Sequence, residues 1–390
     1  MNNLIYMDNA ATTMVLPEVL DAMMPFYKDF YGNPSGSYSF AEISKNAIND
    51  SRKIIADTLN TMPHNIYFTN GGTESDNWAL KSIADSYGKN YGHIITSKIE
   101  HHAILNTCNY LKKKNYDITY IDVDEFGIIN LKQLENSIRN DTILISVMFA
   151  NNETGVIQPI KEIGEIAKKH NIIFHTDAVA AYGHININVD EYNIDLLSVS
   201  GHKFHAPKGV GFLYVRDGID ITSFIHGGDQ ENKLRAGTEN VAGIVGMGTA
   251  CKIAYTDSDS KRNKELILRE KLITRILKEL PFSRLNGSLT NRLSSNVNFS
   301  FQFIESPSLM ELLNEQGICA SGGSACTSAI TEPSHVLSAM GLPDDIASGA
   351  LRLTFNSYTT EAEIDYICEM IIKDVNKLRE MSSLYTFFIS

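Results

Sequence analysis

The sequence has few of the features that mark secreted, membrane-spanning or zinc-binding proteins. It contains five cysteines among 390 residues, and none belongs to a Cys-x-x-Cys pair, which argues against a zinc ribbon or a thioredoxin-like site. Five scattered cysteines are also too few for a disulfide framework, so we expect a cytoplasmic protein with reduced thiols. The longest apolar run, 143–150, has about eight residues, whereas a membrane-spanning helix needs roughly 20. The amino-terminal residues lack the basic start and apolar run of a secretion signal.

Positive charge is also scarce. The chain has 34 Lys and Arg against 46 Asp and Glu, which gives a net charge of −12. A sequence-independent nucleic-acid binder needs clustered Lys and Arg, so we expect neither a nucleic-acid nor a membrane partner. Apolar residues at 43% and charged residues at 21% are typical of globular proteins, and a chain of this length can form two domains.

Short apolar runs alternate with helical patterns through the first two thirds of the chain. Several of the apolar runs are continuous stretches of Ile, Val, Leu and Phe, which is the pattern of a sheet covered on both faces. The alternation predicts an α/β fold with a mostly parallel sheet, whose ligands bind at the carboxyl ends of the strands. We predict strands at 66–69, 93–96, 118–121, 143–149, 172–175, 196–200 and 211–215, and helices at 72–86, 103–114, 131–138 and 160–170.

The pattern changes after about residue 255. A charged helix at 260–279 is followed by a proline and a strand-like segment at 297–303, and an amphipathic helix at 361–379 closes the chain. We therefore predict a large domain at 15–254 and a smaller α+β domain made of 1–14 and 255–390.

Polar motifs follow the ends of three predicted strands. Gly72 and Thr73 stand at a strand-to-helix junction, where free N–H groups can bind a phosphate, although an ordinary capped turn is the alternative. His101, beside His102, can stack on an aromatic cofactor or move protons, or can lie in a surface loop. Asp177 ends an apolar strand, where a carboxylate is costly unless paired; it can meet a protonated ring nitrogen or cap a helix.

Lys203 lies in a short loop between two apolar strands, and lysine seldom occupies buried positions. Desolvation would lower its pKa from ~10.4 toward about 7–8 and make the amine nucleophilic, which suits Schiff-base chemistry. A surface lysine is the alternative.

Cys326 and Arg352 are two further candidates. Small residues surround Cys326, which favours an accessible, reactive thiol, whereas Cys108, Cys251 and Cys368 lie in helix-like patterns and are expected in the core. Arg352 is flanked by leucines and is predicted to bind a carboxylate, either of the protein or of a substrate.

Taken in order, these motifs resemble those of one enzyme family, the NifS/IscS-like cysteine desulfurases. These are pyridoxal-phosphate enzymes of fold type I in the class V aminotransferase superfamily. The resemblance runs from residue 6 to about 360 and implies a homodimer, with a large cofactor-binding domain built on a mostly parallel seven-stranded sheet. The segments that carry it are Asp8-Asn9-Ala10-Ala11-Thr12-Thr13, Gly72-Thr73-Glu74-Ser75, Asn151-Asn152-Glu153-Thr154-Gly155, His202-Lys203, Arg235-Ala236-Gly237-Thr238-Glu239-Asn240 and Ser324-Ala325-Cys326-Thr327-Ser328.

The resemblance implies conversion of L-cysteine to L-alanine with pyridoxal 5′-phosphate as cofactor and no metal. Cys326 would take the sulfur as a persulfide and pass it to an iron–sulfur scaffold or another sulfur-acceptor protein. Lys203 would hold the cofactor covalently and remove a proton from the substrate, Asp177 would pair with the ring nitrogen, and His101 would stack on the ring and move protons. The other implied roles are phosphate binding by Gly72, Thr73, Ser200, His202 and, from a partner subunit, Thr238, and substrate-carboxylate binding beside the cofactor by Asn152 and Arg352.

The sequence departs from the family at Ala180. The family has a glutamine there, three residues after the aspartate, which bonds the phenolic oxygen of the cofactor. The missing donor leaves two related activities open, a selenocysteine lyase and a cysteine β-lyase that yields pyruvate. A non-catalytic sulfur-trafficking protein and a cysteine hydrolase are further alternatives. Neither explains the presence of Lys203 together with the phosphate-binding motif at Gly72 and Thr73.

Overall fold

The computed structural model describes residues 4–88, 91–322 and 333–389. Its strands are β1 (Ile5–Tyr6), β2 (Ile66–Thr69), β3 (Gly92–Ser97), β4 (Tyr116–Ile121), β5 (Thr142–Ser146), β6 (Ile173–Asp177), β7 (Leu196–Ser200), β8 (Gly211–Val215), β9 (Ser283–Leu285), β10 (Asn296–Phe301), β11 (Ile318–Cys319) and β12 (Ala350–Thr354). Its α-helices are α1 (Pro17–Met23), α2 (Pro25–Lys28), α3 (Ser39–Leu59), α4 (Gly72–Tyr87), α5 (His102–Lys112), α6 (Leu131–Asn136), α7 (Ile160–Lys169), α8 (Val241–Tyr255), α9 (Ser258–Glu279), α10 (Ser306–Glu315), α11 (His335–Ala339), α12 (Asp344–Ala347), α13 (Glu361–Glu380) and α14 (Ser383–Ile389).

A seven-stranded sheet forms the centre of the larger part of the molecule. Its strand order is β2-β8-β7-β6-β5-β3-β4, and every pairing is parallel except the two made by β8. The predicted mostly parallel sheet is therefore confirmed, and each of its seven strands was expected within a few residues of where it lies. The largest difference is at β5, which ends at Ser146 rather than at 149. Val147 N and Phe149 N still donate to β6 beyond that point, and Met148 and Ala150 line a cavity.

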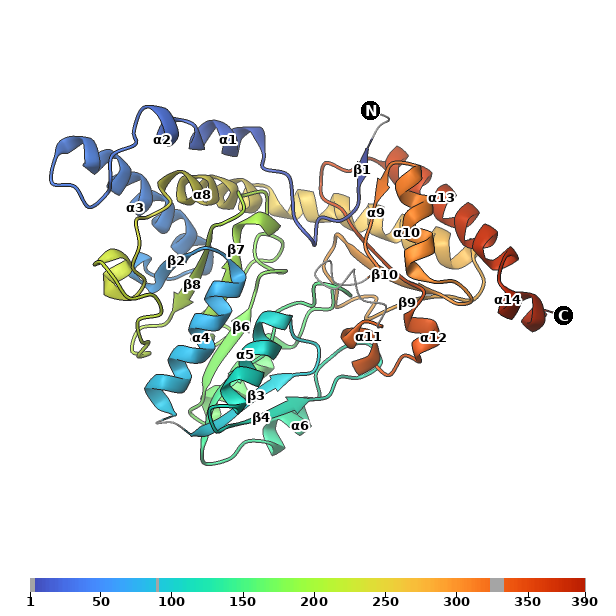
Figure 1. Cartoon of the computed structure of the whole chain (residues 1–390), viewed down its shortest axis with the longest axis horizontal. Helices are drawn as coiled ribbons and strands as arrows, with labels where there is room; N and C mark the ends of the chain where they lie inside the picture. Colours follow the sequence, from blue (N-terminus) through green and yellow to red (C-terminus); the bar gives the residue numbers. More distant parts are fainter. Residues whose placement is uncertain (1–3, 89–90, 323–332, 390) are drawn as a thin grey trace.

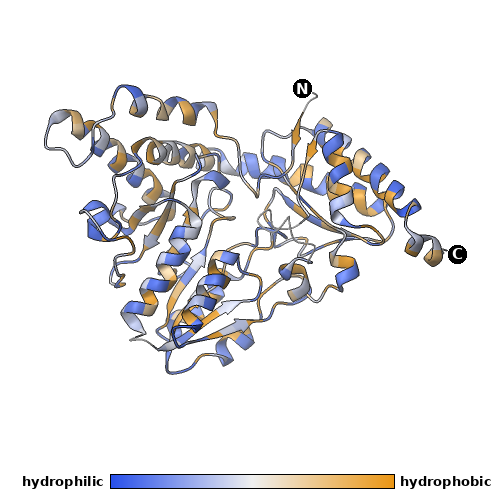
Figure 2. Ribbon diagram, viewed as in Figure 1, coloured by the Kyte–Doolittle hydropathy of each residue, from blue (hydrophilic) through white to orange (hydrophobic). Residues whose placement is uncertain are grey.

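Both faces of this sheet are covered by helices, which explains the continuous apolar runs. Neighbouring residues on one strand pack on opposite sides: Ile94 belongs to the core under α4 and α5, and Ile95 belongs to the core under α1, α3, α7 and α8. Figure 1 shows α4 and α5 in front of the sheet with α3 and α8 across its upper end. In Figure 2 hydrophobic and hydrophilic residues alternate along these helices, and their buried apolar residues pack on the sheet.

A second hydrophobic core lies beside the first (Figure 1). It is formed by α9, α10 and α13, which pack against the antiparallel sheet β12-β10-β9 and the short parallel pair β1-β11. A capping box of Thr360 and Glu363 begins α13. Residues from both ends of the chain meet in this core, as expected for a smaller domain made of 1–14 and 255–390. The domain boundary at 254/255 stays a prediction.

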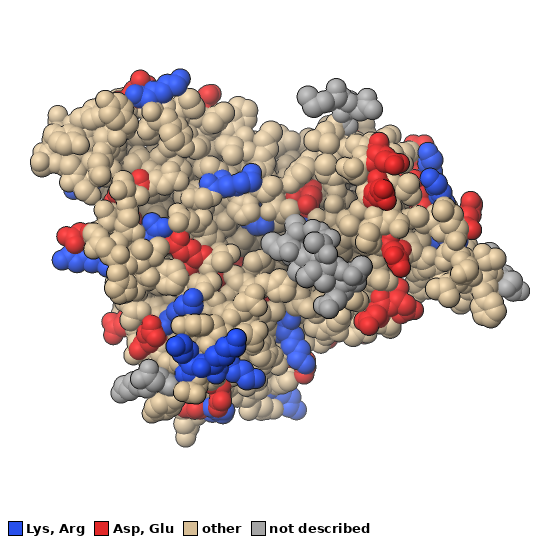
Figure 3. Space-filling model, in the orientation of Figure 1, with Lys and Arg blue, Asp and Glu red and all other residues tan. Residues whose placement is uncertain are grey.

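Charge is unevenly distributed over the view in Figure 3. Lys and Arg gather over α4 and α5, where Lys112, Lys113 and Lys114 are exposed, and Asp and Glu gather over the side that carries α10 to α13. On the face shown, the two signs of charge are therefore separated between the two parts of the molecule. Of the helices described, none combines the length and apolarity needed to cross a bilayer.

Candidate functional site

A cavity of about 230 Å³ lies where the carboxyl ends of the central strands meet the amino-terminal segment and β12. Such a position is the usual ligand site of an open α/β sheet, because the loops that follow parallel strands converge there. All of the predicted cofactor and substrate residues except Thr238 line this cavity. Arg352 comes from β12, and the others come from the carboxyl ends of β6 and β7 and from the segments that follow β2, β3, β5 and β7. The lining residues that matter below are Asn9, Ala10, Ala11, Gly72, Thr73, Asp76, His101, Asn152, Asp177, Ala180, Ser200, His202, Lys203 and Arg352.

A glycine cup forms the end of the cavity at the start of α4. Gly71 has φ of +144°, which favours glycine, and α4 begins at Gly72 with its first N–H groups directed away from the helix. A Cβ on Gly72 would lie 2.5 Å from Val179 Cγ2, and one on Gly71 would lie 3.3 Å from Ser200 Oγ. The two glycines therefore keep open a space that is lined with backbone N–H groups and hydroxyls. This space favours the interpretation of the motif as a phosphate-binding site over its interpretation as an ordinary capped turn.

His202 and Lys203 lie on the short 3-10 turn after β7. Burial, and then Lys203, lower the pKa of His202 to about 4, so its ring is neutral near neutral pH and its Nδ1 lies 3.1 Å from Thr12 Oγ1. Lys203 Nζ donates to the carbonyl oxygens of Ala10 at 2.5 Å and of Ala11 at 2.9 Å. The amine that sequence reasoning singled out thus points into the cavity and is held by the amino-terminal segment.

Asp177 ends β6 at the floor of the cavity. Burial raises the pKa of its carboxyl to about 6, while the N–H of Val179 and the nearby Lys203 act in the opposite direction. The hydrogen bond from Val179 N measures 2.9 Å, so this side chain caps the following turn and also faces the cavity. The side chain therefore caps a turn rather than a helix, and its pairing with a ring nitrogen stays a prediction.

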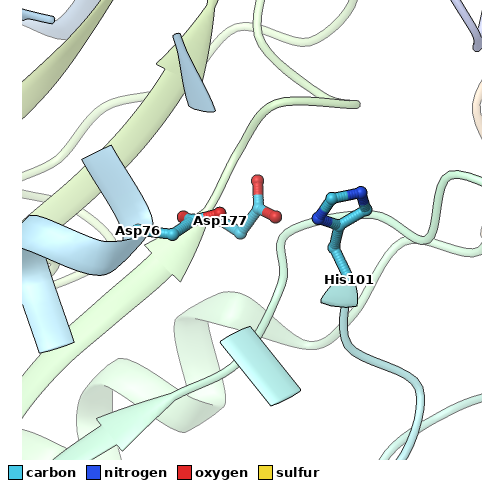
Figure 4. A group of neighbouring side chains, drawn as sticks. All are labelled: Asp76, His101 and Asp177. Atoms are coloured by element: carbon cyan, nitrogen blue, oxygen red, sulfur yellow. The ribbon is translucent and has the colours of Figure 1, made fainter. Parts of the chain in front are cut away.

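A second buried carboxyl, Asp76, stands beside it (Figure 4). Burial and then Asp177 raise the pKa of Asp76 well above its ordinary value, and its Oδ1 has no hydrogen-bond partner in the described parts of the chain. His175 Nε2 lies 3.8 Å from that oxygen, but burial lowers the pKa of His175 to about 3, and its ring nitrogens contact Ser146 and Ser198 at 2.9 Å. A cation bound between the two carboxyls would stabilise both.

His101 faces these carboxyls from the start of α5 (Figure 4). Its Nδ1 accepts a hydrogen bond from Ala103 N at 3.1 Å, which leaves Nε2 as the protonated nitrogen of the neutral ring. Burial, then Lys203 and His102, lower the pKa of His101 to about 4. Ligand atoms of His101, Asp76 and Asp177 lie within 4.8 Å of one another, so distance alone permits a metal ion as well as a protonated ring nitrogen.

Arg352 forms the opposite wall on β12 and is 1% exposed. Its Nη2 donates to Asp8 Oδ1 at 2.7 Å, and its Nη1 donates to the carbonyl oxygen of Asn152 at 3.2 Å. Its Nε has no hydrogen-bond partner among the residues that the structure describes. The protein carboxylate beside this arginine is therefore Asp8, and the arginine also lines the cavity.

Two of the predicted residues are not seen in the cavity. Cys326 lies outside the described residues. Thr238 is exposed on the segment before α8 and is not one of the described residues lining the cavity, which agrees with its expected contribution to another subunit.

The described cysteines are poor nucleophiles. Cys108, Cys251 and Cys368 are fully buried, as predicted, and burial raises their pKa values to about 12, 11 and 11. Burial, and then Asp8, also raise the pKa of the half-buried Cys319.

Asp76 and Asp8 are the site residues that the sequence analysis missed. Asp76 lies one helical turn after Gly72, so the i, i+4 spacing along α4 could have placed it on the same face as the glycine cup. Asp8 gives no such signal, because it lies 344 residues from Arg352 in the sequence.

Comparison with known proteins gives a consistent picture. Residues 5–367 match the family model "Aminotransferase class-V". The chain is 53% identical over 383 residues to "Cysteine desulfurase IscS" of Methanosarcina thermophila, covering 98% of this chain and 95% of that protein. It is 50% identical over 387 residues to "Cysteine desulfurase IscS" of Clostridium botulinum, covering 99% and 98%.

Solved structures agree with these relatives. A NifS-like protein superposes with a TM-score of 0.90 at 38% identity, covering 96% of this chain and 99% of the other. A structure titled "SspA in complex with cysteine" gives a TM-score of 0.82 at 39% identity, covering 91% and 100%. This chain therefore belongs to the class-V aminotransferase family and, within it, to the pyridoxal-phosphate-dependent cysteine desulfurases of the NifS/IscS type.

Proposed function

We propose that the protein converts L-cysteine to L-alanine and carries the released sulfur as a persulfide on Cys326. The observation that carries this proposal is the convergence of Lys203, Asp177, His101 and the glycine cup on one cavity, with Arg352 opposite them. The relatives named cysteine desulfurase and the neighbour solved with cysteine point to the same chemistry.

The residues fit pyridoxal phosphate. The cup at Gly72, with Thr73, Ser200 and His202, would bind its phosphate, and His101 would stack on its ring. Asp177, whose pKa is raised to about 6 by burial, would become a stable anion beside a protonated ring nitrogen. Oδ1 of the neighbouring Asp76, which lacks a hydrogen-bond partner among the described residues, also favours a positively charged ring nitrogen here.

When bound, pyridoxal phosphate supplies an aldehyde that captures amines and a ring that accepts the electron pair released from Cα. Lys203 would hold the aldehyde and, once the substrate amine has taken its place, would accept the Cα proton. Arg352 and Asn152 would bind the α-carboxylate and so orient the Cα–H bond toward that amine. Because Nδ1 of His101 accepts from Ala103 N and Nε2 carries the proton of the neutral ring, His101 would first donate that proton near the sulfur and take one back later.

Cys326 would act as the sulfur acceptor. Its thiolate attacks the substrate sulfur, an S–S bond forms, the C–S bond breaks, and the electron pair returns to the carbon skeleton. Protonation of that skeleton gives L-alanine, so one cysteine and one thiol yield one alanine and one persulfide. The raised thiol pKa values of Cys108, Cys251 and Cys368 support the choice of a cysteine outside the core.

A second copy of this chain would complete the site. Exposed Thr238 would reach the phosphate of the neighbouring subunit. An unusually apolar surface over α1, α2 and the start of α3 supports such an interface, since patches of this kind mark contact sites. The exposed residues are Met14, Leu20, Tyr27, Phe30, Tyr31, Tyr38 and Ile43.

The persulfide would pass to an iron–sulfur scaffold or another sulfur-acceptor protein. We propose the cytoplasm as the site of action, because a persulfide-forming thiol must stay reduced between turnovers.

The test compares Cys326→Ser with Cys319→Ser in the cofactor-loaded protein. Both variants should stay yellow, but only Cys319→Ser should gain one sulfur atom by mass spectrometry after L-cysteine is added. Undiminished L-alanine production by Cys326→Ser would refute the role of Cys326.

The same reaction mixture tests the alternative that Ala180 leaves open. This side chain lines the cavity and has no group that can donate to the phenolic oxygen of the cofactor. Pyruvate and ammonia in place of alanine would establish a β-lyase instead.

A further inference from the structure

The amino-terminal motif 8–13 holds Lys203 through Ala10 and Ala11, and it also reaches Arg352. Its first residue, Asp8, follows β1 and reaches β12 from the other end of the chain. Asp8 Oδ1 accepts from Arg352 Nη2 at 2.7 Å, and Asp8 Oδ2 accepts from Ser321 Oγ at 2.8 Å. Both oxygens are therefore occupied, and the side chain is only 15% exposed.

These contacts fix the plane of the Arg352 guanidinium. A guanidinium is flat, so holding Nη2 at Asp8 and Nη1 at the carbonyl of Asn152 leaves little freedom for the rest of the group. The buried Nε, with no partner among the described residues, belongs to a side chain that lines the cavity. Nε and the second Nη2 hydrogen together form an edge that matches a carboxylate.

We propose that Asp8 is a positioning residue that orients Arg352 toward the α-carboxylate of the substrate. It also balances the charge of an arginine that is 1% exposed, which would otherwise be costly to bury. Asp8 thereby sets the preference of the site for amino acids over simple amines. This inference rests on the proposed function, which assigns Arg352 to the substrate carboxylate.

The experiment measures binding rather than turnover. The cofactor-loaded protein is titrated with L-alanine, which has the carboxylate, and with ethylamine, which lacks it, and the visible absorption of the cofactor reports binding. Asp8→Ala should weaken L-alanine binding by about 10- to 100-fold and change ethylamine binding by less than about twofold. Asp8→Asn keeps an acceptor for Nη2 of Arg352 and should lose less affinity for L-alanine. If Asp8→Ala does not fold, the affinities of Asp8→Asn for L-alanine and ethylamine test the proposal.

The control is Asp217→Ala, which removes an exposed carboxylate paired with His64 and should change neither affinity. Equal losses for both ligands would indicate a general structural role, and tighter L-alanine binding would mean that Asp8 competes with the substrate for Arg352. Either result overturns the proposal, as does no change.

Arg352→Ala separates this inference from the proposed function. If Arg352→Ala does not weaken L-alanine binding relative to ethylamine, the assigned carboxylate site itself is wrong. If Arg352→Ala has the selective effect and the Asp8 variants do not, only the positioning role fails.

Discussion

Replacing Glu100 by glutamine should stabilise the protein above neutral pH and change its stability little near pH 4.5. Glu100 is fully buried, and burial raises the pKa of its carboxyl from 4.5 to about 8. Its Oε1 accepts from Ser97 Oγ at 2.5 Å and from Met148 N at 3.0 Å, while its Oε2 has no partner in the described part of the chain. Glutamine can keep both accepted bonds and cannot ionise.

The direction of this pH effect on stability depends on whether the folded or the unfolded chain holds the proton of Glu100. Between about pH 4.5 and pH 8 the folded protein keeps the Glu100 proton and the unfolded chain releases it, so stability falls as pH rises through this window. Each pH unit above the pKa of the unfolded chain lowers the free energy of unfolding by about 1.4 kcal/mol. At about pH 7.5 the free energy of unfolding of the wild-type protein is therefore lower by on the order of 4 kcal/mol, and Glu100→Gln should restore it.

The measurement is the unfolding temperature of the cofactor-free protein at about pH 5 and about pH 7.5. The entropy of unfolding is roughly 2 cal/mol/K for each residue. In a chain of 390 residues a change of about 4 kcal/mol in the free energy of unfolding therefore shifts the unfolding temperature by about 5 °C. The difference between Glu100→Gln and wild type should therefore grow by several degrees between the two conditions. Glu125→Gln makes the same chemical change at an exposed position and should show no such growth. A difference that stays constant or shrinks with rising pH would refute the reasoning.

Three further predictions test the cavity. Lys203→Ala should abolish the covalently linked yellow cofactor, which mass spectrometry after borohydride reduction would detect; a retained adduct would mean that another lysine carries it. Gly72→Ala should lower cofactor affinity at least about tenfold in equilibrium dialysis, because the added Cβ lies 2.5 Å from Val179 Cγ2; unchanged affinity would argue against the cup. Ala180→Gln should move the pH midpoint of the cofactor absorption downward, since the new donor stabilises the anionic phenolic oxygen; an unmoved midpoint would show that the amide does not reach it.

Local patterns were enough for the larger part of the fold. The segment at 196–200, Leu-Leu-Ser-Val-Ser, is short and carries only apolar and small hydroxyl side chains, and it became a strand buried on both faces. The strand-to-helix junction at Gly72 and the strand end at Asp177 were also readable, because sheet topology brings the carboxyl ends of parallel strands to one edge whatever the details of packing. The sequence could therefore predict which loops form the cavity.

Other features depend on contacts between segments that are distant in sequence. The reversed direction of β8 and its place between β2 and β7 follow from packing across the sheet, which no local pattern encodes.

The sequence by itself determined the α/β class, the family and the candidates Lys203, Asp177, His101 and Arg352, since each depends on neighbours along the chain. Only the tertiary structure decided that Asp8 is the carboxylate beside Arg352, that the buried carboxyl of Asp76 lies next to Asp177, and that Lys203 is held by the amino-terminal segment. Burial and nearby charges shift the pKa values of Asp76, Asp177 and His101, and both causes depend on atoms that folding brings together from distant positions.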